Sequence, residues 1–150
     1  MAFKHMVRIA GQDVPGSDKV VYSISRVKGV GINLAHAIVR IAGIDPELRM
    51  GFLSDSDIKR IEEIITSLPK HNIPDWMLNR RKDLESGMNI HLVGSDLILK
   101  VKADIDLMKK IKCWKGVRHA LGLKVRGQKT RTTGRAGQTV GVSRKPARRR

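Results

Sequence analysis

Residues 27–44, VKGVGINLAHAIVRIAGI, combine a glycine turn with an apolar pattern of helical period. Beyond the turn, apolar side chains recur three or four residues apart, at Ile32, Ala35, Ile38, Val39 and Ala42. This spacing places them on one face of a helix. Gly43 follows the pattern and is suited to end the helix. The stretch therefore predicts an amphipathic helix that packs on a core through a single face.

The turn before this helix is Gly29-Val30-Gly31, preceded by Lys28. A glycine turn that opens a helix leaves backbone N–H groups beside the positive end of the helix, which favours a phosphate. The same glycines are also what a plain tight turn needs. Because the third glycine of a dinucleotide-binding fingerprint is absent, these residues leave both interpretations open.

Residues 54–69, SDSDIKRIEEIITSLP, predict a second helix. Ser54 and Asp57 have the spacing of a capping box, and Pro69 ends the pattern. One apolar stripe contains Ile58, Ile61, Ile64, Ile65 and Leu68. Glu62 and Glu63 lie off the stripe, and adjacent helical residues point apart, so the pair is a poor candidate for acid–base catalysis.

The other segments before residue 116 are shorter or less regular. Residues 7–19 predict extended chain and turns, and residues 20–27 a short helix. Residues 74–87 mix a short helical piece with the cluster Arg80-Arg81-Lys82, which is either a solvated face or a second RNA contact. Within that segment, Trp76 is interpreted as a core anchor rather than a platform for base stacking.

A long third helix is predicted near residues 95–112. Apolar residues keep helical spacing there, at Leu97, Val101, Ile105, Met108 and Ile111, and Ser95 can cap the first turn. Lys109, Lys110 and Lys112 suit the negative end of the helix. We expect this helix to lead directly into the C-terminal segment.

Charge is distributed unevenly along the 150 residues, whose net charge is +16. Residues 1–108 hold 15 basic and 14 acidic residues, whereas residues 109–150 hold 15 basic and no acidic residues. We call residues 109–150 the basic arm. Its like charges repel one another, so it needs a dense anionic partner to become compact. Nucleic acid is the leading candidate. A disordered solubilising tail is the alternative, but the regular placement of glycine and threonine in the arm argues against it.

Several classes of protein are not expected. No run of 18 apolar residues occurs, so neither a transmembrane helix nor a membrane partner is predicted, and the N-terminus lacks the apolar region of a secretory signal. Cys113 is the only cysteine, which excludes an intramolecular disulfide and fits a reducing cytosol. Cys113 and His119 alone cannot form a structural zinc site. No catalytic motif is present, so the sequence predicts no enzyme, metal or cofactor.

Residues 115–128, KGVRHALGLKVRGQ, resemble the signature of the small-subunit ribosomal protein family numbered thirteen. That signature reads basic, Gly, any residue, Arg, His or Tyr, two free positions, a small residue, two free positions, an aliphatic residue and Arg-Gly-Gln. Every fixed position matches. Residues 8–11 and 28–31 also resemble the family, whereas Pro74-Asp75-Trp76 and residues 132–145 resemble its archaeal and eukaryotic-type branch. The segment Met88–Gly94 departs most from it, and its role stays open.

The resemblance implies a mainly α fold. A helix–two-turn–helix body would occupy residues 1–93, a long helix residues 94–115, and an extended basic RNA-binding tail residues 116–150. These bounds agree with the helices that the apolar patterns predict.

The resemblance also implies a function. The family is a structural constituent of the small ribosomal subunit, cytoplasmic in the ribosome, and binds ribosomal RNA in the subunit head. Its body meets the fifth large-subunit ribosomal protein at an inter-subunit bridge, and it pairs with the nineteenth small-subunit ribosomal protein. Its tail approaches the transfer RNA in the peptidyl site.

The expected RNA contacts are arginine and lysine for phosphates, glycine for close backbone approach, and threonine and glutamine for phosphate, sugar or base edges. His119 is either a stacking residue or a small polar filler. Because aromatic residues are few, recognition is expected to depend mainly on RNA shape and backbone. The ribosomal RNA set is Lys28, Gly29, Gly31, Lys115, Gly116, Arg118, His119, Lys124, Arg126, Gly127, Gln128, Lys129, Thr130, Arg131, Thr132, Thr133 and Arg135. The transfer RNA set is Arg144, Lys145, Arg148, Arg149 and Arg150.

Two other functions share features with this sequence. DNA-repair glycosylases also contain a helix–two-turn–helix body, but they need an N-terminal proline beside glutamate, and this chain begins Met-Ala-Phe. A DNA-compacting protein would share the basic arm. Sequence-independent DNA binding would distinguish it from a protein that binds one folded RNA.

Overall fold

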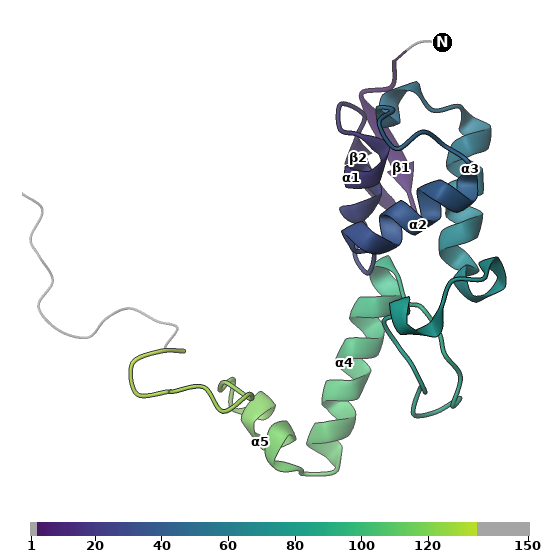
Figure 1. Ribbon diagram of the computed structural model, residues 1–150. Coiled ribbons are helices and arrows are strands. Elements are labelled where there is room, and N and C mark those ends of the chain that lie inside the picture. The colour runs from purple at the N-terminus through teal and green to yellow at the C-terminus, as the bar shows by residue number, and fades with distance from the viewer. Residues whose placement is uncertain (1–2, 135–150) are drawn as a thin grey trace, which may run out of the picture. The chain divides into compact units, whose positions relative to one another are not determined.

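The computed structural model describes residues 3–134, and this part of the chain is mainly helical, which confirms the expected fold class. It divides into two compact units between Val101 and Lys102. Unit 1 contains strands β1 and β2 and helices α1 to α3, whereas helix α4 runs across the division and α5 belongs to unit 2 (Figure 1). The expected three-part division of the chain stays a prediction.

Unit 1 begins with a β-hairpin. Strands β1 (Met6–Ile9) and β2 (Gln12–Pro15) pair antiparallel. The two-residue turn between them is Ala10-Gly11, with φ of 46° and 74°, as a tight hairpin turn requires. The Ala10 N–H donates to Glu62 Oε1 at 3.0 Å. Glu62 therefore holds the hairpin turn, a structural role that sequence reasoning did not foresee.

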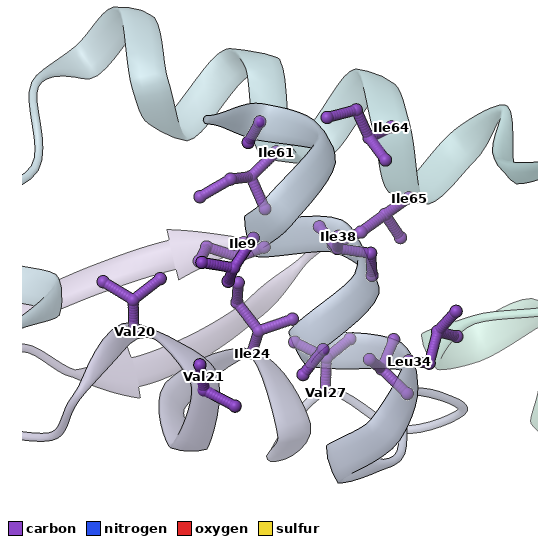
Figure 2. Packing of buried hydrophobic residues seen from close by; sticks show 14 of the residues in the cluster. Ile9, Val20, Val21, Ile24, Val27, Leu34, Ile38, Ile61, Ile64 and Ile65 are labelled. Carbon is purple, nitrogen blue, oxygen red and sulfur yellow. The ribbon is translucent and has the colours of Figure 1, made fainter. Parts of the chain in front are cut away.

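Three helices pack with this hairpin around one aliphatic core (Figure 2). They are α1 (Val20–Ser25), α2 (Ile32–Ala42) and α3 (Asp55–Thr66). The predicted capping box of α3 is present between Ser54 and Asp57, and Gly43 ends α2 with a φ of 71°. The core combines Ile9 of β1, Ile24 of α1, Ile38 of α2 and Ile61 of α3, none of which is exposed to solvent. Both helices predicted for residues 32–67 are thus confirmed, with their apolar faces inward.

Short 3-10 turns connect and follow these helices: η1 (Met50–Phe52), η2 (Leu68–His71) and η3 (Asp75–Met77). The interpretation of Trp76 as a core anchor is wrong, because its side chain in η3 is 70% exposed. The buried side chains of this segment are Ile73 and Leu78, on either side of η3. A single turn between two inward-facing residues leaves the indole outside.

The predicted basic cluster Arg80-Arg81-Lys82 divides into two parts. Arg80 Nε donates to Asp83 Oδ1 at 2.5 Å, and this guanidinium lowers the pKa of the Asp83 carboxyl to about 2. Ser86 and Lys100 also interact favourably with that carboxylate. Arg81 and Lys82 are exposed. Arg80 is therefore a structural residue of unit 1, and only its two neighbours present charge to a partner.

Helix α4 (Gly94–Lys110) is followed by α5 (Trp114–Ala120). Two expectations need correction. The helix that apolar spacing predicts near residues 95–112 is present as α4, but it ends at Lys110 rather than near residue 115, and the chain beyond it is helical again before it becomes extended. Lys112, with φ of 56°, lies in the bend between the helices. Cys113 caps α5, since its Sγ accepts the Gly116 N–H at 3.4 Å.

Candidate RNA interface

Unit 2 presents a surface rich in unpaired positive charge. Residues 102–134 hold ten Lys or Arg against Asp104 and Asp106, and Asp106 pairs with Lys109 at 3.3 Å. Seven exposed cations have no carboxylate partner within residues 3–134: Lys110, Lys112, Lys115, Lys124, Arg126, Lys129 and Arg131. Their donors are available to a polyanion.

Packing between α4 and α5 depends on Gly116. This residue is buried, and a Cβ added there would lie 2.1 Å from the carbonyl oxygen of Met108. Only glycine lets the two backbones come this close. The expected reason for Gly116, close approach to RNA, is therefore replaced by a packing role inside unit 2.

The spacing of the signature around Arg118 has a structural basis in how α5 ends. Gly122 takes the left-handed conformation, with φ of 67°, and the Leu123 N–H donates to the Arg118 carbonyl at 2.9 Å. Such a glycine stop turns the chain back past the helix end. The side chain of Arg118 then donates from Nε to the Lys124 carbonyl at 2.5 Å. The guanidinium carbon also lies 5.8 Å from the centroid of the Trp114 ring.

The rest of the predicted arm, up to residue 134, is irregular and almost wholly exposed. Gly127 and Gly134 both have left-handed φ values, of 70° and 77°. The Thr133 hydroxyl donates to the Lys129 carbonyl, and Gly134 lies against the Lys124 side chain. These contacts turn the segment back on itself. The predicted contact residues that are exposed in it are Lys124, Arg126, Gly127, Gln128, Lys129, Thr130, Arg131, Thr132 and Thr133, whereas His119 in α5 is half-buried.

The predicted contacts Lys28, Gly29 and Gly31 belong to unit 1. Gly29 has φ of 101°, and a Cβ there would lie 2.4 Å from the Leu92 carbonyl oxygen. The Lys28 carbonyl accepts the Gly94 N–H at 2.8 Å. A tight turn packed on residues 92–94 thus accounts for Gly29. Gly31, in contrast, is exposed at the start of α2, with open space where a Cβ would stand, so that helix end is accessible to an anion.

Six predicted residues lie outside the described part of the chain: Arg135, Arg144, Lys145, Arg148, Arg149 and Arg150. Sequence reasoning missed one exposed aromatic residue inside it. Trp114, between Cys113 and Lys115, is 72% exposed. The sequence signal for it was present, since this tryptophan is flanked by basic residues in the run KKIKCWKGVR.

No group of three His, Cys, Asp or Glu side chains within residues 3–134 could hold a metal ion. Cys113 is a free, half-buried thiol. None of the helices in this range is long and apolar enough to cross a membrane.

Comparison with known proteins agrees with the motif at residues 115–128. Residues 8–136 match the family described as ribosomal protein S13/S18. The chain is 58% identical to the small ribosomal subunit protein uS13 of Staphylothermus marinus over 143 residues, which cover 95% of each chain. It is 59% identical to the uS13 of Sulfurisphaera tokodaii over 97% of this chain and 84% of that protein. The uS13 of Aeropyrum pernix is 47% identical over 96% of each chain. This chain therefore belongs to the ribosomal protein S13/S18 family.

Proposed function

We propose that this chain is a structural, non-enzymatic constituent of the small ribosomal subunit and binds ribosomal RNA in the subunit head. Its family and its uS13 relatives support the place in the small subunit. The observation that carries RNA binding is the set of seven exposed cations in residues 109–134 without a carboxylate partner in the described chain. Phosphates bound there would release counterions, which is the main source of affinity for nucleic acid.

The two units have different proposed tasks. Unit 1 has a complete aliphatic core and nearly balanced charge, which suits a rigid part that other proteins contact. Unit 2 supplies Arg118, Arg126, Lys129 and Arg131 for phosphates, together with threonine hydroxyls for sugar and phosphate oxygens. The open start of α2 at Gly31 adds a second, smaller phosphate contact.

The finer assignments follow from family membership. We propose that Arg144, Lys145, Arg148, Arg149 and Arg150 contact the transfer RNA in the peptidyl site. The protein neighbours would be the nineteenth small-subunit protein and, at an inter-subunit bridge, the fifth large-subunit protein. In this role the chain acts in the cytoplasm, within the ribosome.

Binding of the purified chain to an RNA fragment of the small-subunit head tests the proposal. The titration is repeated at several salt concentrations, with a scrambled RNA and a duplex DNA of equal length as competitors. A preference for the head fragment that persists at high salt supports a shaped RNA site. Equal binding to all three polymers, with equal salt slopes, would leave only a non-specific polycation and would contradict the proposal.

A further inference from the structure

The exposed indole of Trp114 is a feature of unit 2 that phosphate binding does not explain. Its side chain is 72% exposed at the first position of α5. An indole left in water has a large apolar surface without a partner. The packing of Gly116 against the Met108 backbone fixes α5 on α4, so this surface is presented by a rigid element of the unit.

Arg118 is placed to work with this indole. Its guanidinium carbon lies 5.8 Å from the ring centroid, which is within the range of a cation–π contact. Its Nε is already bonded to the Lys124 carbonyl. Because two contacts hold the guanidinium, its remaining N–H donors are pre-oriented next to the ring, where they suit a phosphate.

Charge around the indole indicates which kind of partner it meets. Residues 107–134 contain nine Lys or Arg and no Asp or Glu. Trp114 has Lys112 and Lys115 on either side in the sequence, both exposed. Bases stack on aromatic rings in RNA-binding proteins while cations hold the adjoining backbone.

A protein is the alternative partner for this surface. Val117 of α5 and its C-cap residue Leu121 lie three and seven residues after Trp114 and are also exposed, so the helix and its end present a short apolar stripe. That stripe is narrow, and the charged residues around it in the sequence are all cations. A polyanion is therefore favoured as the partner over an apolar protein surface.

We infer that Trp114 stacks on an unpaired base of the RNA that unit 2 binds, while Arg118 holds a phosphate beside that base. The inference rests on the proposed RNA-binding function and adds one binding residue to it. It also assigns a class of RNA element, since a stacked base must come from a loop, a bulge or a single strand rather than from a regular duplex.

Fluorescence separates this inference from RNA binding as such. In the full chain with Trp76→Phe, Trp114 is the only tryptophan. The head RNA fragment is titrated into this variant while binding is followed independently by the anisotropy of a label on the RNA. Quenching of Trp114 that saturates together with binding is the expected result. Binding without any change in fluorescence would overturn the inference and leave the proposed function intact. A chain that fails to bind the fragment would overturn both.

Substitution then distinguishes base stacking from an apolar protein contact. Trp114→Ala is expected to weaken RNA binding roughly 5- to 150-fold, the effect of losing one stacked base, and Trp114→Phe is expected to retain most of the affinity. Leu121→Ala, at the exposed C-cap of α5, is the matched control and should bind normally. An equal loss for Leu121→Ala, or normal binding by Trp114→Ala, would contradict stacking. Far-UV circular dichroism verifies that each variant keeps its helices.

Discussion

The sharpest test of the charge argument is to neutralise Arg126 and Arg131 with glutamine. Both side chains are exposed, and neither has a carboxylate partner within the described chain. If each holds one phosphate, the double variant loses two counterion-releasing contacts. The slope of log affinity against log salt should then fall in magnitude by about 1.4–1.8, at about 0.7–0.9 for each contact. At 0.1 M salt this corresponds to a loss of affinity of roughly 25- to 60-fold.

A matched control removes the same net charge from a different place. Lys4 pairs with Asp55, and Lys19 pairs with Glu47, both in unit 1. The variant Lys4→Gln with Lys19→Gln has the same formal charge as the arginine variant. Its slope should stay close to that of the unaltered chain, because those cations are already neutralised by carboxylates.

The assay is fluorescence anisotropy with the head RNA fragment at five or more salt concentrations, for the unaltered chain and both double variants. Only the arginine variant is expected to show a smaller salt slope than the unaltered chain. Equal reductions in slope for the two double variants would contradict this expectation, since affinity would then follow net charge rather than the unpaired cations of residues 109–134.

Three further predictions concern stability and packing. Ile61→Ala deletes three carbons from a fully buried side chain and should lower the free energy of unfolding by ~2.5–4 kcal/mol, from about 0.8 kcal/mol per carbon plus a cavity cost. Ile98→Ala, at a half-exposed site, should lower it by less than ~1 kcal/mol. Urea denaturation measures both values, and similar values would contradict the assigned core. Gly116→Ala should displace α5 and weaken RNA binding, because the added Cβ would collide with the Met108 backbone. The urea midpoint of unit 1 should stay unchanged, and normal RNA binding by the variant would show that this packing is not needed. The pKa of Asp83 is lowered from 3.8 to about 2, mainly by Arg80. The stabilisation from this carboxylate is therefore complete above about pH 4 and is lost as the pH falls towards 2. Asp83→Asn should lack this loss of stability in an acid titration, and an acid profile equal to that of the unaltered chain would contradict the lowered pKa.

The parts of the fold that were predictable depend on local rules. The helices of residues 32–67 follow from apolar spacing, and the start of α3 follows from Ser54 and Asp57, which satisfy each other within one turn. Gly43 was also recognisable, because a left-handed residue after a helix is usually glycine. Each of these signals needs only residues that are close in the sequence.

The parts that were not predictable depend on contacts between distant residues or on single turns. Trp76 has the size of a core residue, and only the burial of Ile73 and Leu78 around it leaves the indole exposed. Glu62 gained a role from the hairpin turn 52 residues earlier. Arg80 has no sequence signal that separates it from its two basic neighbours, because its pairing with Asp83, three residues away, lies in irregular chain and follows from no regular element.

The candidate site was predictable in composition but not in geometry. A basic, glycine-rich signature indicated nucleic acid, and the exposed cations of residues 109–134 are consistent with that interpretation. The same composition suggested a fully extended segment and concealed α5, whose formation depends on the Cys113 cap and on the fit of Gly116 against α4. Trp114 was overlooked because its exposure follows from that helix.

The contact between residues 109–150 and small-subunit RNA can be measured by ultraviolet crosslinking of intact small ribosomal subunits that contain this chain, followed by mass spectrometry of the crosslinked peptides. We predict that peptides from residues 109–150, including those around Trp114 and Arg126, carry most crosslinks to small-subunit RNA. Crosslinks confined to the surface of α1 to α3, or the absence of the chain from the subunits, would contradict this prediction.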